Sequence, residues 1–425
     1  MTIAVTTYLY SRICSVSLPL ETKRFTITHP KHKPMSDESF FTLAVHAGED
    51  RDSHFGALSV PVYNASVYAF SDAEEGAAIH NEFKDGYYYG RLGNPTTNAL
   101  EQTVAELEGA ESCLAFASGM AAISAAILAH VRAGDHIVAP ESMYSTTTNF
   151  LRHLAENLKI ETTFVDAANP ENYRDAVHPN TKLFWLETPS NPLLRVTDLE
   201  KVSEIAKTQG IVTVVDNTFA TPFNQRPIEL GVDLVIHSGT KYLGGHSDLT
   251  SGLLAGRGDI VKHVRTVATK LFGGNIAPQV AWLVMRGIKT LALRMERHNA
   301  NASALANMLS DNPKVSAVYY PGLSTHQNHE IAAKQMSGFG GMVSFDLGTV
   351  EAGKSFVNNV RLAALATSLG GVETIVQHAA SMTHASIPAE ERRRAGISDG
   401  LIRMSVGIED VNDLAVDITQ AIDAI

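Results

Sequence analysis

The sequence predicts an α/β protein with a mostly parallel central sheet, helices on both faces of that sheet, and a smaller α+β domain toward the C-terminus. The first observation is that short apolar runs alternate with helical segments between residues 112 and 238. Such runs are typical of strands in a parallel sheet that helices cover on both sides. The second is that this alternation stops near residue 286. The third is the length of 425 residues, 44% of them hydrophobic, which allows a large core and about two to three domains.

The first 90 residues do not show this alternation. Residues 1–34 contain one acidic side chain, Glu21, and five Lys or Arg side chains. An organelle transit peptide is one interpretation of this composition, but we expect a disordered or non-native extension with Met35 as the effective start. Residues 35–90 contain turns without a strong hydrophobic period and are predicted to form an N-terminal arm.

Residues 91–286 are predicted to form the large α/β domain. We expect strands at 113–118, 136–140, 160–166, 182–187, 211–216 and 232–238, with helices at 119–131, 146–158 and 198–209. In open sheets of this kind, ligands bind beyond the carboxyl ends of the strands.

Residues 287–425 are predicted to form the smaller α+β domain. One long helix is expected over residues 286–311, because its pattern continues without a Pro. Strands are expected within 315–322, 340–348 and 403–410, and a second helix near 351–359.

The composition argues against several classes of protein. A net charge of −11 disfavours a nucleic-acid-binding surface. The sequence contains no run of 18 apolar residues, so we expect no membrane span. Its two cysteines, Cys14 and Cys113, indicate a reduced, cytoplasmic protein without a disulfide framework. His326 and His329 lie close together, but strong ligands are missing nearby, so no metal site is expected.

Three kinds of chemical group follow the predicted strands at positions that meet on one rim of the sheet. Asp216 ends one strand, Lys241 follows the next, and Ser118-Gly119-Met120 lies where a strand turns into a helix. The first N–H groups of a helix form a ready anion site. The rim therefore offers a carboxylate, an amine and a phosphate cradle, to which the hydroxyl groups of Ser238 and Thr240 are expected to contribute.

Pyridoxal 5′-phosphate is a cofactor that uses all three groups. Its aldehyde reacts with a lysine amine, its phosphate suits a helix N-terminus, and its ring nitrogen needs an acidic partner. The residues alone leave other interpretations open. Lys241 taken singly is typical of a solvated loop, and Asp216 of a cap at the end of a strand.

Seven motifs, in order along residues 40 to 425, resemble the Cys/Met-metabolism family of pyridoxal-phosphate enzymes. That family includes cystathionine γ-synthase, cystathionine γ-lyase, methionine γ-lyase and the acylhomoserine sulfhydrylases. The motifs are YGRLGNPTTNALE, ASGMAAI, ETPSNP, VVDNTFATP, HSGTKYLGGHSD, SLGGVETIVQHAASMTH and RMSVGIED. The resemblance implies a fold type I (aspartate-aminotransferase-like) enzyme and a homo-oligomer, expected to be a tetramer.

The resemblance also implies a role for individual residues. Lys241 matches the lysine that binds the cofactor aldehyde covalently and later carries protons between substrate carbons. Asp216 matches the partner of the ring nitrogen, and Tyr144 the aromatic residue stacked on the ring. The other cofactor-binding matches are Gly119, Met120, Ser238 and Thr240 at the phosphate, and Asn191 near the phenolic oxygen.

Further matches concern the partner subunit and the substrate. Tyr89 and Arg91 match a pair that enters the neighbouring subunit's site and binds its phosphate, which implies that the arm contacts a partner. Tyr89 is also a catalytic candidate. Arg403 matches the arginine that holds the substrate carboxylate, and Ser368 a backbone contact beside it.

The substrate pocket departs from the patterns of the subgroups. Relatives that handle cystathionine usually carry Glu before SLGG, whereas this chain has Thr367. Methionine γ-lyases also lack that Glu, but they usually carry a cysteine in the loop after the stacking tyrosine. Here that loop reads Tyr144-Ser-Thr-Thr.

The sequence is therefore compatible with three functions. The first, which we expect, is γ-elimination from methionine, homocysteine or a related γ-substituted amino acid, with release of a 2-oxo acid and ammonia. The second is γ-replacement on O-acylhomoserine, and cystathionine γ-lyase activity is a further variant. A non-catalytic cofactor-binding protein is a remote alternative, because Lys241, Asp216 and Arg403 are all present.

Overall fold

The computed structural model describes residues 38–50, 54–82, 84–383, 385 and 389–425. The predicted extension over residues 1–34 lies outside the described residues. Residues 35–425 form one compact unit. No helix in the described part of the chain is long and apolar enough to cross a membrane.

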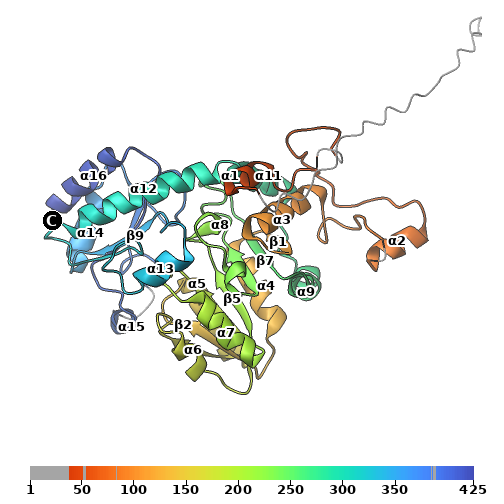
Figure 1. Ribbon diagram of the computed structural model, residues 1–425, viewed down its shortest axis with the longest axis horizontal. Helices are drawn as coiled ribbons and strands as arrows, with labels where there is room; N and C mark the ends of the chain where they lie inside the picture. Colours follow the sequence, from red (N-terminus) through yellow and green to blue (C-terminus); the bar gives the residue numbers. More distant parts are fainter. Residues whose placement is uncertain (1–37, 51–53, 83, 384, 386–388) are drawn as a thin grey trace, which may run out of the picture. The chain divides into compact units, whose positions relative to one another are not determined.

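A seven-stranded sheet forms the centre of the first part of this unit (Figure 1). Its strands are β1 (Ser112–Phe116), β2 (His136–Pro140), β3 (Glu161–Val165), β4 (Thr181–Glu187), β5 (Val212–Asp216), β6 (Leu234–His237) and β7 (Gly252–Gly256). The spatial order is β1-β7-β6-β5-β4-β2-β3. Strands β3, β2, β4, β5 and β6 pair in parallel, whereas β7 is antiparallel to both β1 and β6.

All six strands predicted in this region are present, and β7 is the strand that sequence analysis missed. Its five residues, Gly-Leu-Leu-Ala-Gly, lack the alternation with a helix that marks the others. Gly252 is needed because a Cβ atom there would lie 2.1 Å from the carbonyl oxygen of Ser118. The chain therefore passes against the start of the helix that follows β1.

Helices cover both faces of the sheet, as predicted. On one face, α4 (Gly119–His130), α5 (Ser145–Leu158) and α9 (Gly258–Val264) pack on side chains such as Trp185 and Ile236. On the other face, α7 (Leu199–Gln209) packs on Phe184 and Val235. The helices α3 (Pro95–Glu108) and α11 (Pro278–Ile288) cover the β1–β7 end of that second face.

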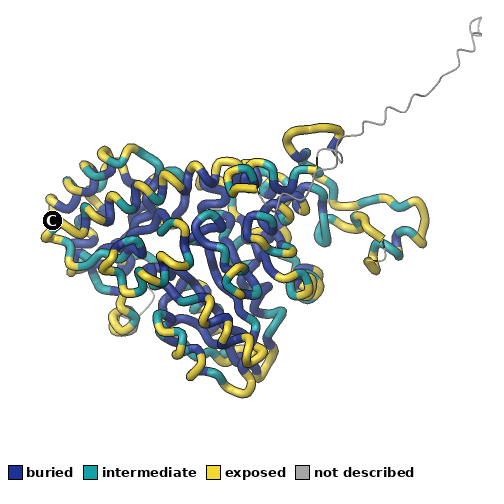
Figure 2. The backbone as a smooth tube through the Cα atoms, in the orientation of Figure 1, coloured by how far each residue is buried: buried dark blue, intermediate teal, exposed yellow. Residues whose placement is uncertain are grey.

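The second sheet has five strands in the order β10-β11-β12-β9-β8. They are β8 (Ala317–Tyr319), β9 (Met342–Asp346), β10 (Ala364–Leu365), β11 (Ile375–His378) and β12 (Leu401–Ser405). Three helices, α12 (Leu291–Ser310), α14 (Val350–Asn359) and α16 (Val411–Asp423), bury their apolar residues against β9, β11 and β12. Figure 2 shows the interior of the unit as buried and the outer helices as half exposed; the edge strands β3, β8 and β10 are only partly covered. The domain boundary at residue 286 remains a prediction.

The remaining elements are short. They are α1 (Phe40–His46), α2 (Ala73–His80), α6 (Glu171–Asp175), α8 (Thr221–Asn224), a 3₁₀ turn (Pro227–Leu230), a π-helical turn (Arg265–Thr269), α10 (Lys270–Phe272), α13 (His329–Gln335) and α15 (Ala389–Arg394). The predicted arm thus contains two short helices, α1 and α2.

The prediction of one helix over residues 286–311 is wrong, because the chain breaks between α11 and α12. Gly287 packs so closely on the turn after β6 that a Cβ atom would lie 2.3 Å from the carbonyl oxygen of Gly244. The guanidinium of Arg294 donates to the carbonyl of Gly287 at 2.8 Å and to the carbonyl of Tyr242 at 2.7 Å. The first bond supplies a donor to a carbonyl at the end of α11. Together the two bonds connect that helix end to the turn that carries Lys241.

Candidate active site

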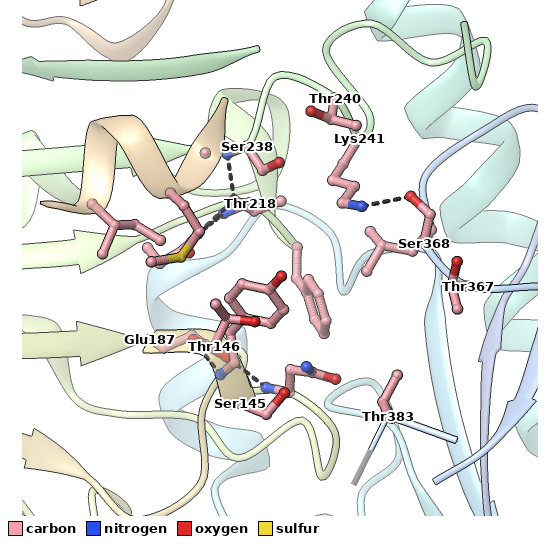
Figure 3. A pocket seen from close by; sticks show the side chains of 18 of the residues that line it. Ser145, Thr146, Glu187, Thr218, Ser238, Thr240, Lys241, Thr367, Ser368 and Thr383 are labelled. Atoms are coloured by element: carbon pink, nitrogen blue, oxygen red, sulfur yellow. Dashed lines mark hydrogen bonds between the residues drawn. The ribbon is translucent and has the colours of Figure 1, made fainter. Parts of the chain in front are cut away.

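A cavity of about 590 Å³ lies at the carboxyl ends of β4, β5 and β6, between the two sheets (Figure 3). It is lined by nearly all the site residues that the sequence predicted: Gly119, Met120, Tyr144, Asn191, Asp216, Ser238, Thr240, Lys241, Thr367, Ser368 and Arg403. Tyr89 and Arg91 are not among its lining residues. Segments from residue 118 to residue 403 therefore meet in one place.

Lys241 extends into the cavity from the turn after β6, and its Nζ donates to the hydroxyl of Ser368 at 2.5 Å (Figure 3). Burial and the positive charge of Arg403 lower the pKa of this amine to about 8, against the opposite effect of Asp216. About a tenth of the amine is therefore unprotonated at pH 7, far more than for an ordinary lysine, and this is the form that attacks a carbonyl carbon.

Asp216 is the last residue of β5 and is buried. Its Oδ1 accepts from the N–H of Thr218 at 3.0 Å and from the hydroxyl of Thr218 at 2.5 Å. Burial raises the pKa of Asp216, while the two Thr218 bonds and the positive charges of His237 and Lys241 lower it. Burial is the largest of these effects, so the pKa of Asp216 stays raised overall, and a cationic ring nitrogen would stabilise the ionised carboxylate.

The N-terminus of α4 lies at the other end of the cavity. The hydroxyl of Ser118 accepts from the N–H of Ala121 at 3.2 Å, so it caps the helix behind Gly119 and Met120. A Cβ atom on Gly119 would lie 3.0 Å from the side chain of Ser238. The glycine thus keeps open a space between the helix N–H groups and this hydroxyl, as an anion cradle requires.

Thr240 differs from the expectation of a free hydroxyl donor at the phosphate. Its Oγ1 donates to the carbonyl of Ser251 at 3.2 Å and accepts from the N–H of Ser251 at 3.0 Å. The hydroxyl proton is therefore used within the protein, and Thr240 fastens the Lys241 turn to the start of β7.

Arg403 on β12 is buried, with its guanidinium directed to the cavity end near Ser368. It donates to the amide oxygen of Asn191 at 2.9 Å and to the carbonyl of Ser368 at 2.7 Å. Its cross-strand neighbour Gln377 accepts from Nε at 2.6 Å when its amide oxygen faces the guanidinium. Burial lowers the pKa of Arg403 to about 10, so it keeps its charge at neutral pH.

Ser368 contacts both of the main cationic groups of the cavity. Its hydroxyl accepts from Lys241 and its carbonyl accepts from Arg403. Its φ of 82° lies in the left-handed region, which a serine adopts at a cost of about 1–3 kcal/mol. The strained backbone is what allows one residue to meet both groups.

Glu187 is a cavity residue that sequence analysis did not single out. It ends β4 directly beside Asp216 in the register of the sheet, and its carboxylate accepts from the N–H groups of Tyr144 and Asn191 at 2.9 Å and 2.8 Å. Burial and the charge of Asp216 raise its pKa. Glu187 could have been found from the sequence, because it is an acidic residue at the end of a buried strand, as Asp216 is. Glu187 fixes both the start of α5 and the loop of Asn191.

Tyr144 precedes α5 and lines the cavity with a ring that is 41% exposed. Ser145 and Thr146 follow it, and Thr367 and Thr383 line the same cavity from other segments (Figure 3). Thr250 is a further lining residue. Several cavity-lining residues that are not predicted to bind the cofactor therefore carry hydroxyl groups.

Tyr89 and Arg91 lie on the arm. Tyr89 pairs with Val67 in an isolated bridge and is 42% exposed. The Arg91 guanidinium donates to the carbonyl of Lys270 and stands over the Tyr89 ring, 5.7 Å from its centroid. Within one chain, these side chains do not complete the cavity.

Comparison with known proteins identifies relatives across almost the whole chain. A family model described as "Cys/Met metabolism PLP-dependent enzyme" matches residues 41–423. An L-methionine gamma-lyase from Fusobacterium nucleatum is 46% identical over 394 residues, 92% of this chain and 100% of the relative. A cystathionine gamma-lyase from Bacillus subtilis is 47% identical over 384 residues, 90% of this chain and 99% of the relative.

Solved structures show the same likeness. The crystal structure of metB from Corynebacterium glutamicum has a TM-score of 0.86 and 41% identity, covering 92% of this chain and 99% of that chain. The structure of cystathionine gamma-lyase from Lactobacillus plantarum complexed with L-serine has a TM-score of 0.86 and 38% identity, covering 91% and 99%.

The fold and the cavity together define a pyridoxal-phosphate-dependent enzyme of fold type I. The chain belongs to the Cys/Met metabolism family of these enzymes, and the relatives support carbon–sulfur lyase activity. The residues present fit the cofactor. The α4 cradle at Gly119 suits a phosphate, the Lys241 amine suits an aldehyde, and Asp216 suits a ring nitrogen.

Proposed function

We propose that this enzyme removes the γ-substituent of methionine, homocysteine or a related amino acid, releasing a 2-oxo acid and ammonia. The observation that supports this choice is Thr367 at the cavity wall. Among the described residues that line the cavity, the carboxylates are Asp216 and Glu187, and both are buried at the ends of β5 and β4. A distal ammonium beside Thr367 would therefore lack a partner, and an unpaired charge is costly to desolvate.

When bound, pyridoxal phosphate supplies an electron sink for the carbon from which a proton is removed. Lys241 accepts and returns protons at Nζ, and its lowered pKa keeps the amine available for this role. Arg403 binds the substrate carboxylate with a planar, two-pronged guanidinium that Asn191 and Ser368 already orient. Asp216 would hold the ring nitrogen, and Tyr144 would cover the ring.

One observation favours γ-replacement on an O-acylhomoserine as the second candidate. Ser145, Thr146, Thr250, Thr367 and Thr383 present hydroxyl groups to the cavity. Hydroxyl donors suit the carbonyl oxygen of an ester better than the sulfur of a thioether, which is a weak acceptor. The Bacillus subtilis relative is a cystathionine gamma-lyase, and Thr367 disfavours that activity in this chain.

We expect Thr367→Glu to raise cystathionine turnover relative to methionine turnover by about tenfold, because roughly 1.4 kcal/mol of charge pairing is gained. Thr367→Gln is the matched control, since it adds the same bulk without the charge. The assay gives the purified enzyme each amino acid alone and then with a thiol, and measures 2-oxobutanoate and any new thioether together.

Oxo-acid release from methionine supports elimination. Thioether formation from O-acylhomoserine with negligible oxo acid would instead establish replacement. Cystathionine as the best substrate of the unmodified enzyme would show that Thr367 does not set the specificity.

We further propose that the active site is shared between two subunits, in a dimer that pairs into a tetramer. The arm that carries α2 projects away from both sheets (Figure 1), and its Phe55, Leu58 and Val67 are 99%, 71% and 71% exposed. Exposed apolar side chains of this size are typical of an interface. The same arm carries Tyr89 and Arg91, whose chemistry suits a phosphate.

Mixing inactive Arg91→Ala subunits with inactive Lys241→Ala subunits at equal ratio should restore activity in about a quarter of the sites if exchange is random, an estimate from interface symmetry alone. Each mixed dimer then contains one site with both residues intact. The absence of recovery, with subunit exchange shown by native mass spectrometry, would mean that each site is built within one chain.

The compartment we propose is the cytoplasm. The supporting observation is that Cys113 is a free, buried thiol, as expected where thiols remain reduced.

A further inference from the structure

Glu108 and His237 form a hydrogen bond in the interior behind the active site. The His237 Nε2 lies 2.5 Å from the Glu108 Oε1, and the two side chains are 1% and 0% exposed. Neither residue lines the cavity. Two titratable groups have thus been buried together at a place where neither can meet substrate.

The local structure does not explain this pair as a source of stability. Glu108 is the last residue of α3, where the negative end of the helix dipole disfavours a carboxylate. Within the described residues, Glu108 Oε2 and His237 Nδ1 have no hydrogen-bond partner. A buried ion pair compensates for its desolvation only when its remaining polar atoms are satisfied. By contrast, the buried Asp417 accepts from three backbone N–H groups, which is a structural arrangement.

The pair is instead connected to the ends of β5 and β6, which carry two cofactor-binding residues. Glu108 Oε1 also accepts from the amide of Asn217 at 3.3 Å, and Asn217 follows Asp216. His237 precedes Ser238, whose N–H donates to the hydroxyl of Thr218 at 2.8 Å.

The hydroxyl of Thr218 in turn donates to Asp216 at 2.5 Å. Glu108 is therefore connected to the Asp216 carboxylate along two routes. One runs through Asn217 at the end of β5, and the other runs through His237, Ser238 and Thr218. One buried acid on α3 fastens the residue for the ring nitrogen and a residue for the phosphate.

We propose that Glu108 and His237 are positioning residues whose buried ion pair holds the ends of β5 and β6 together and keeps Asp216 ionised toward the cofactor's ring nitrogen. The His237 side chain stands next to the end of β5, which carries Asp216, and the Glu108 carboxylate is its hydrogen-bond partner. In agreement with this, the charge of His237 lowers the pKa of Asp216 against the effect of burial. The inference does not depend on which amino acid is the substrate.

The test compares two probes on the full-length apoenzyme: pyridoxal 5′-phosphate and its 1-deaza analogue, which has carbon in place of the ring nitrogen. The measured quantity is the dissociation constant of the analogue divided by that of pyridoxal 5′-phosphate, so a high ratio means a preference for the natural cofactor. Glu108→Gln keeps the size and an acceptor oxygen but removes the charge. We expect the preference for the natural cofactor to fall about tenfold, equivalent to one pKa unit at Asp216, with affinity for the analogue little changed.

The matched control is Asp417→Asn, which removes the charge of a buried carboxylate on α16, a helix that packs on the second sheet. It should lower thermal stability and leave the ratio unchanged. A ratio that falls as far in this control as in Glu108→Gln would overturn the proposal, because the ratio would then report stability. An unchanged ratio in Glu108→Gln, or equal loss of both probes, would also overturn it.

If Glu108→Gln does not fold, the double variant Glu108→Gln/His237→Gln replaces the charged pair by two amides that can still bond to each other. The proposal expects the same fall in the ratio. A folded double variant with the wild-type ratio would show that the charges of this pair do not act on Asp216.

Discussion

Lys241→Ala protein, reduced with borohydride in the presence of pyridoxal phosphate, should retain no covalently bound cofactor, whereas wild-type protein should retain one per chain. Lys241 is the lysine that extends into the cavity, and its pKa of about 8 makes its amine a nucleophile near neutral pH. Because the same amine moves protons, lyase activity should fall by about 10²- to 10⁴-fold. Mass spectrometry of the reduced protein checks the linkage, and oxo-acid release checks the rate.

Lys262→Ala is the control for this experiment. Its amine pairs with Glu82 on the surface, and its side chain is 66% exposed. That variant should retain both the linkage and the activity. A reduced adduct of unchanged stoichiometry in Lys241→Ala would assign the linkage to another lysine.

Arg403→Lys should lose about 1.5–3 kcal/mol of transition-state stabilisation, the range for a hydrogen bond to a charged group. Lysine keeps the positive charge but cannot bond both carboxylate oxygens at once. It also cannot donate to Asn191 and Ser368 as the guanidinium does. We expect kcat/KM to fall roughly 10- to 150-fold, mainly through KM.

Arg294→Lys is the matched control, since Arg294 is also buried but bonds backbone carbonyls at the junction of α11 and α12. It should lower the free energy of unfolding rather than raise KM selectively. Unchanged kinetic constants in Arg403→Lys would remove Arg403 from carboxylate binding.

The parallel strands were predictable from the sequence because each is a short apolar run between helices. Strand β7 was not, because Gly252–Gly256 has small residues at both ends and no helix on one side. The break between α11 and α12 was hidden for another reason. It depends on Arg294 reaching Tyr242, a contact across 52 positions of the chain that no local pattern records.

The candidate site shows the same limit. Asp216 and Lys241 could be found from their places after strands, and Glu187 carried that signal as well. Arg403 and Ser368 lie more than 120 positions further along, so only the family resemblance connected them to the rim before the fold did. The predicted role of Tyr89 and Arg91 is in the site of a second subunit. A single sequence does not show how two subunits are arranged.

The position of β1 at the edge of the seven-stranded sheet has a consequence for how the protein is made. Its partner in that sheet is β7, which begins at Gly252. During synthesis at about 5–20 residues per second, β1 must wait roughly 7 to 30 s for that partner to leave the ribosome. Through this interval the apolar residues Cys113, Leu114 and Phe116 have an unpaired backbone beside them. We therefore expect β1 of a nascent chain to remain an unpaired apolar strand until β7 has been made.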